Sequence, residues 1–182
     1  TLWTEVPPLA SLREAGAQAG QAGVWPDDDF VVRRTPPGED TLSARLAALA
    51  RQAAPQAFAP GAPPAPWLRY AGPRGSFDTR SYYQAVGPGL LPPGFFQGKL
   101  VLVGRAVRTG TEISGAQADM FNSPFAWADG SDRLIPGVEL HAHLLANRLL
   151  GQGQHPPSLP WPWIAGLLAA TAIAALGQRV HP

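Results

Sequence analysis

The fold class is indicated most strongly by the stretch Lys99-Leu100-Val101-Leu102-Val103-Gly104. Its apolar residues follow one another without alternating with polar ones, which predicts a strand buried on both faces. Strands of this kind are typical of the centre of a parallel sheet. We therefore expect Lys99–Gly104 to be a central strand of an α/β fold.

The segments on both sides of this strand alternate between helical and extended patterns. After it, Pro136-Gly137 opens a helix predicted over Val138–Leu150, and Gly151 is placed to end that helix. Before it, the patterns predict a helix over 7–20, a turn at Asp27–Asp29, a helix over 42–50 capped by Asp40 or Thr41, a short strand over 67–70, and one or two helical turns over 81–86. This order predicts an α/β fold with a mixed or mostly parallel sheet flanked by helices.

The C-terminal segment differs in kind, because residues 161–177 carry no charge. A transmembrane helix is predicted over 163–179, with Trp161 and Trp163 at one interface and Arg179 at the cytoplasmic end. The alternative is an alanine-rich helix buried in a protein core.

Hydropathy divides the chain into three parts. Residues 1–152 are assigned to a folded domain, 153–162 to a Pro-rich juxtamembrane linker and 163–179 to the membrane helix. Residues 1–160 are then expected outside the cytoplasm. The chain does not begin with methionine, which favours a segment of a longer protein.

Composition and motifs exclude several classes of site. A net charge of +1 gives no excess of positive charge for a nucleic-acid partner, and the absence of cysteine excludes disulfides, iron–sulfur clusters and a thiol nucleophile. Gly94–Lys99 has the wrong glycine spacing for a phosphate-binding loop, and no G-x-S-x-G motif is present. Glu139, His141 and His143 lack the HExxH spacing of a zinc site. We therefore predict no catalytic residue, no metal ligand and no cofactor.

A ligand site is expected where the predicted strand ends. Arg105 and Arg108 follow Gly104, and ligands of open α/β sheets bind outside the carboxyl ends of strands. An arginine there can hold a carboxylate or phosphate with two parallel bonds. The alternative is that both arginines form ion pairs with Glu112 or Asp119 and simply order the loop. The candidate ligand-binding residues are Arg105, Arg108, Asp119, Glu139 and His141.

Three segments together resemble the bacterial CHASE2 extracytoplasmic sensor domain. Residues 91–104, LPPGFFQGKLVLVG, are similar to the family's strand motif F-x-G-K-I/V-V-L-I/V-G, and residues 135–142, IPGVELHA, are similar to its helix start P-G-V-E-I-H-A. Residues 24–34, VWPDDDFVVRR, are similar to its D-x-D-G-x-x-R-R segment. The resemblance covers nearly the whole chain and corresponds to the C-terminal part of the domain. The departures are Phe30 in place of a usual glycine, Arg105 in place of a small residue and His143 where asparagine is common.

The resemblance implies an input module. Domains of this family lie outside the bacterial inner membrane and are joined, through membrane helices, to adenylate or diguanylate cyclases, histidine kinases or serine/threonine kinases. This segment itself is then not an enzyme; its partners are the membrane, an unidentified small-molecule or periplasmic ligand and, as in many such receptors, a second copy in a homodimer. The predicted helix Val138–Leu150 would transmit the signal. The alternative function is a membrane-tethered periplasmic α/β enzyme or solute-binding module.

Overall fold

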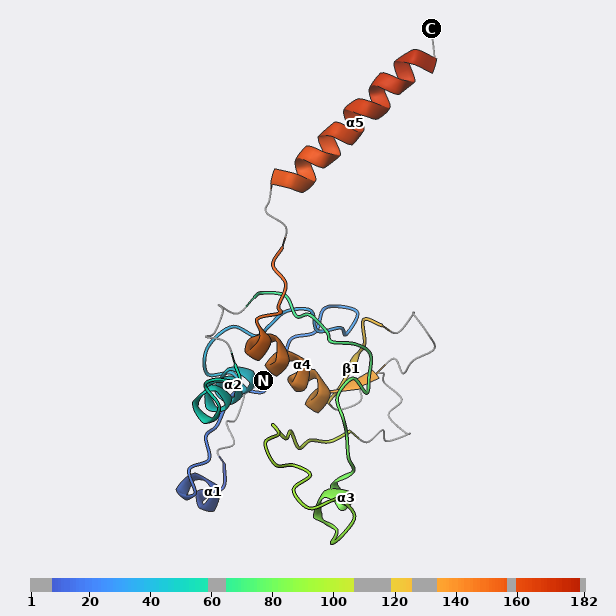
Figure 1. The fold of residues 1–182 in the computed structure, drawn as a ribbon. Helices are drawn as coiled ribbons and strands as arrows, with labels where there is room; N and C mark the ends of the chain where they lie inside the picture. Colours follow the sequence, from blue (N-terminus) through green and yellow to red (C-terminus); the bar gives the residue numbers. More distant parts are fainter. Residues whose placement is uncertain (1–7, 59–64, 107–118, 126–133, 157–159, 181–182) are drawn as a thin grey trace.

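The computed structural model describes residues 8–58, 65–106, 119–125, 134–156 and 160–180 (Figure 1). Helices dominate this part of the chain, beside one small sheet. In chain order the elements are α1 (Ala10–Glu14), α2 (Leu42–Ala53), α3 (Tyr82–Val86), β1 (Met120–Asn122), β2 (Leu134–Pro136), α4 (Gly137–Leu150) and α5 (Pro160–Val180).

Helices α2 and α4 form the centre of the folded part. The Thr41 hydroxyl oxygen accepts a hydrogen bond from the Ala44 N–H over 3.3 Å and so caps α2. The contact between the two helices involves Ala47, Ala50, Leu145 and Leu149. A second buried cluster, on another part of α4, joins Val32, Leu68, Leu140 and Leu144.

The carboxyl end of α4 is fixed to the start of α2 by Arg148, whose side chain is only 7% exposed. Its guanidinium donates to the carbonyl oxygens of Pro36 and Gly38 over 3.3 and 3.2 Å, and to the Ser43 hydroxyl over 3.2 Å. Gly151 then ends the helix in the left-handed conformation, with φ of 61°, as predicted. This end of α4 therefore has one defined position in the fold.

The sheet in the described residues is antiparallel and has two strands. β1 pairs with β2 so that Met120 lies opposite Pro136 and Phe121 opposite Ile135. The sequence analysis missed both strands, because a strand of three residues is too short for an alternating pattern. Helices beside a small sheet agree with a mixed α/β class, whereas the predicted parallel sheet is not shown.

The predicted central strand over Lys99–Gly104 is wrong. The segment forms no strand, and Leu100 and Val103 are 52% and 76% exposed. A run of apolar residues indicates only that a segment tends to be buried, not that it forms a strand. Among the described residues, no strand pairs with Lys99–Gly104. Gly104 instead lies against the first turn of α4, where a Cβ on it would be 2.5 Å from the Val138 Cβ.

The other local predictions are met to different degrees. The helix expected over 7–20 is present as the short α1, and Gly16 follows its end with φ of 89°. The helix expected over 42–50 extends to Ala53, and α3 agrees with the turns expected over 81–86. Residues 67–70 make isolated pairings in place of a strand.

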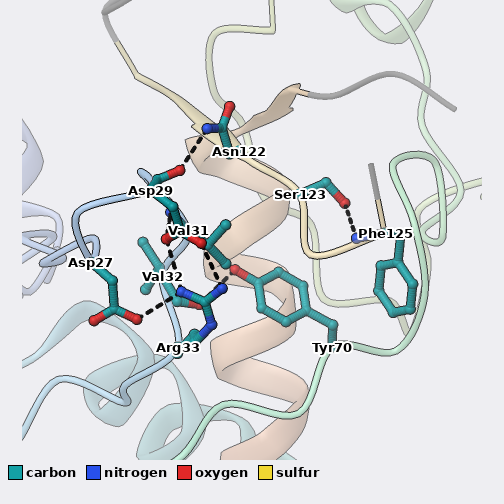
Figure 2. A network of polar contacts seen from close by, with 9 residues as sticks. All are labelled: Asp27, Asp29, Val31, Val32, Arg33, Tyr70, Asn122, Ser123 and Phe125. Atoms are coloured by element: carbon teal, nitrogen blue, oxygen red, sulfur yellow. Dashed lines mark hydrogen bonds and ion pairs between the residues drawn. The ribbon is translucent and has the colours of Figure 1, made fainter. Parts of the chain in front are cut away.

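The turn predicted at the three aspartates is confirmed (Figure 2). Asp29 Oδ1 accepts a hydrogen bond from the Val31 N–H over 3.2 Å, and the Arg33 guanidinium donates to Asp27 over 2.9 Å and to both oxygens of Asp29 over 2.8 and 2.7 Å. Hydrogen bonding to Arg33 lowers the pKa of Asp29 to about 2. Phe30, which stands where glycine is usual in the resembled motif, has φ of 60°.

Helix α5 extends away from the folded part in Figure 1. Its window Pro160–Gly177 has a mean hydropathy of 1.4 and is not buried, so it is long and apolar enough to cross a membrane. The helix begins before the predicted residue 163, because proline is well tolerated in a first helical turn, whose N–H groups need no partner within the helix. The predicted linker 153–162 therefore overlaps the start of α5.

Candidate functional site

A polar stripe follows one face of α4. Glu139, His143 and Asn147 recur at every fourth residue, a spacing that places side chains on the same face of a helix. The segment Trp67–Ser76, here called the strap, runs along this stripe in the direction opposite to α4. Each of the three side chains bonds to the strap's backbone, and we take strap and stripe together as the candidate functional site.

Asn147 holds the strap at Arg69. The Arg69 N–H donates to Asn147 Oδ1 over 2.9 Å, and Asn147 Nδ2 donates back to the Arg69 carbonyl over 2.6 Å. The same Nδ2 also donates to the carbonyl of His143 over 2.8 Å. Asn147 is buried, and its side-chain amide supplies the backbone of Arg69 with the donor and acceptor that a neighbouring strand would supply in a sheet.

His143 holds the next part of the strap. The Ala71 N–H donates to His143 Nδ1 over 3.2 Å, which places the proton of the neutral imidazole on Nε2. The rings of Tyr70 and Phe77 enclose the imidazole, with centroids 5.0 and 4.9 Å away. The residue is fully buried, and this burial lowers the pKa of His143 to about 4. Nε2 has no hydrogen-bond partner.

Glu139 holds the far end of the strap. Its Oε1 accepts hydrogen bonds from the N–H groups of Gly75 over 2.6 Å and of Ser76 over 3.1 Å. Two adjacent N–H groups that converge on one carboxylate oxygen form a charge-assisted contact. Glu139 was predicted as a ligand-binding residue, and in this structure it binds the strap.

The opposite end of the strap joins the linker to α5. Trp67 and Gln154 exchange two backbone hydrogen bonds, of 3.1 and 2.9 Å. The strap also pairs on its other edge, since the Leu68 N–H donates to the carbonyl of Arg33 over 2.8 Å. The Trp67 end is therefore held from both sides, between the segment after the aspartate turn and the residues that lead to α5.

Tyr70 ties the middle of the strap to the aspartate turn (Figure 2). Its hydroxyl donates to the carbonyl of Val32 over 2.7 Å, and burial raises its pKa. The aspartate turn also contacts β1, because Asn122 Nδ2 donates to the carbonyl of Asp29 over 2.6 Å. The strap thus lies at the junction of α4, the aspartate turn and the linker.

Two other predicted site residues meet on a different side of α4. Asp119 has φ of 62°, and its carbonyl accepts the Gly137 N–H over 2.9 Å. The carboxylate lies so close to this glycine that a Cβ on Gly137 would be 1.8 Å from Asp119 Oδ1. Burial lowers the pKa of His141, and the Asp119 charge opposes that change. His141 Nδ1 is buried without a partner.

Of the two arginines predicted to bind a ligand, Arg105 and Arg108, the structure describes only the first. Arg105 is exposed and follows Gly104, beside the first turn of α4. Arg108 lies outside the described residues. No group of three or more histidine, aspartate and glutamate side chains in the described ranges is arranged to hold a metal ion.

The sequence analysis missed Asn147 and gave His143 no role in the site. The signal that could have found them is their spacing of four residues from Glu139 along a helix whose other buried side chains are mostly apolar. Polar residues repeated on one face of a buried helix need partners, and a polar backbone segment can supply them.

Comparison with known families accounts for these features together. The family model of the CHASE2 domain matches residues 4–178, a range that includes the aspartate turn, the strap, the polar stripe and most of α5. No curated protein and no solved structure matches the chain. CHASE2 domains are extracytoplasmic, non-catalytic sensory domains of membrane signalling proteins. The chain belongs to the CHASE2 domain family.

Proposed function

We propose that the folded part of this chain is the input domain of a receptor in the bacterial inner membrane, with a cyclase or kinase output domain on the cytoplasmic side. The observation that carries this proposal is the continuous hydrogen-bonded path from α4 through the strap to Gln154, six residues before α5 begins. A change that moves the strap along α4 reaches Gln154 through two backbone hydrogen bonds and passes from there along the chain into α5.

A ligand would act near the start of α4. Arg105, Asp119 and His141 lie at its first two turns, and Glu139 lies on the strap side of the same turns. We propose these four residues as contacts for a small-molecule or periplasmic ligand. A ligand that favours one arrangement of these groups would bias the position of the strap.

The membrane topology can be tested with single thiols, because the chain contains no cysteine. Ala48→Cys places a thiol on the exposed face of α2, and His181→Cys places one after α5. In spheroplasts, a membrane-impermeant maleimide is expected to label the first variant and to reach the second only after permeabilisation. Labelling in the reverse order would contradict the proposed orientation.

Coupling through the linker can be tested without knowing the stimulus. Asn147→Leu perturbs the strap, and in the full-length receptor it is expected to change the activity of the output domain. Replacing residues 155–159 with glycine and serine keeps Gln154 paired but makes the linker flexible, and should abolish that change. The same replacement in the proline-rich stretch 60–64 is the control. An equal response to Asn147→Leu with either linker would refute the proposal.

A further inference from the structure

The strap is held at one end by the side chains of His143 and Glu139, and at the other by a neutral amide and backbone pairing. Three backbone N–H groups, those of Ala71, Gly75 and Ser76, donate to His143 Nδ1 and Glu139 Oε1. Toward the linker, the strap is held by the neutral amide of Asn147 and by backbone pairing with Gln154. Acid can therefore act on one end of the strap alone.

Protonation removes the acceptor at His143. An imidazolium donates from both nitrogens, so a protonated His143 turns a donor toward the Ala71 N–H. The bonds from Gly75 and Ser76 to Glu139 lie one helical turn away on α4 and hold the next part of the strap.

No carboxylate faces His143 among the described residues to stabilise a positive charge on its imidazole. The groups that face its imidazole are the aromatic rings of Tyr70 and Phe77, and burial is the one cause that shifts its pKa. The strap's own charged groups are Arg69, whose backbone bonds Asn147, and Arg74, which precedes Gly75 and has an interaction of its own. The charged pair Asp78–Arg80 lies beyond the strap.

The remaining titratable groups of α4 face elsewhere. His141 is two residues from both acceptors and lies on the side of Asp119. Arg148 is engaged with the start of α2. Neither group supplies a counter-charge to an imidazolium at His143.

We propose that the strap is an acid-sensitive clasp: when the medium outside the membrane becomes acidic, a proton taken up by His143 releases the strap from α4 at Ala71, while the Trp67 end stays attached to the linker. Release itself is independent of any output domain. Its use as a signal rests on the proposed input function, and would make acid a stimulus of the receptor.

The size of the effect follows from His143. Its pKa is about 4 when the strap is closed and returns to the ordinary 6.5 on release. A lowered pKa means that the closed state binds fewer protons, so closure weakens as the pH falls below 6.5 and stops weakening below about 4. Between pH 7 and pH 5 the ratio of open to closed strap is expected to rise about 20-fold.

Hydrogen exchange on the 182-residue chain in lipid nanodiscs tests this directly. Protection factors, corrected for the intrinsic effect of pH, are measured for peptides covering the strap and α2. The strap is expected to lose protection about 20-fold between pH 7 and pH 5, while α2 loses none. The variant Glu139→Gln/His143→Asn keeps an oxygen acceptor at each position but cannot titrate, and is expected to show no loss.

Each other outcome overturns the clasp. Equal losses in the wild type and the double variant, or no loss in either, would remove the role of these two residues. If the His143→Asn change prevents folding, the wild type still decides, because an NMR titration that gives His143 a pKa near 6.5 in the folded chain contradicts the proposal. Failure here leaves the input function standing, since that function is tested separately by the linker replacement.

Discussion

Asn147→Leu is the sharpest test of the strap as a structural unit. Leucine is branched at Cγ like asparagine and suits a helix, so the change removes the hydrogen bonds of Asn147 while keeping the branched shape of its side chain. Three bonds are lost, to the Arg69 N–H, the Arg69 carbonyl and the His143 carbonyl. The two groups of Arg69 are left facing an apolar side chain.

The cost is set by those two backbone groups. A buried donor or acceptor without a partner costs about 1–3 kcal/mol. The Arg69 residue is itself exposed, so water reaches part of its backbone and the lower half of that range applies. The free energy of unfolding should therefore fall by about 2–4 kcal/mol. For a domain of this size that corresponds to a fall in Tm of roughly 4–16 °C.

Thermal unfolding followed by near-ultraviolet circular dichroism measures this loss. The matched control is Asn122→Leu, because Asn122 makes one side-chain hydrogen bond, to the carbonyl of Asp29 at the surface. That change should cost no more than about 1 kcal/mol. An equal fall in Tm for both variants would refute the reasoning that Asn147 holds a buried backbone segment.

Two further predictions concern backbone positions. Gly137→Ala puts a Cβ 1.8 Å from Asp119 Oδ1 and is expected to lower the free energy of unfolding, measured with urea, by about 2 kcal/mol. In an Asp119→Ala background the same change should lower it by almost nothing, and additive losses would contradict the contact. Phe30 has φ of 60° and a half-exposed ring, so Phe30→Gly should raise the free energy of unfolding by about 1 kcal/mol. Phe30→Ala removes the same ring but does not relieve the backbone, and should lower the free energy of unfolding. Changes of the same sign in the two variants would contradict a strained turn.

Local signals in the sequence predicted the local structure well. Helix α4, its glycine end and the aspartate turn depend on residues within a few positions of one another, and the structure contains all three. The family was also recognisable, because its motifs lie in short contiguous segments. Glu139 was predicted as a ligand-binding residue, and that role stays a prediction, because its partner in the structure is the strap.

The long-range part of the site could not be predicted. The strap bonds to side chains that lie 63 to 78 positions away, through backbone groups that nearly every residue possesses. A backbone N–H leaves no mark in the sequence, so only the acceptor side, the polar stripe, was readable. The error over Lys99–Gly104 has a related cause, since an apolar run does not say which element will cover it.

The way in which the strap is held explains how a local event could reach the membrane. Side chains of α4 bond to the strap's N–H and C=O groups, which recur at fixed intervals, so the strap cannot slide by a fraction of a residue without losing Asn147 and His143 together. The Ser76 end depends on Glu139, whereas the Trp67 end is paired on both edges. A perturbation at Glu139 or His143 therefore opens the strap from its Ser76 end. What remains is a shorter attachment between α4 and Gln154, in which the Asn147 side chain is the last contact of α4 with the strap and the Trp67 pairing still joins the strap to the linker.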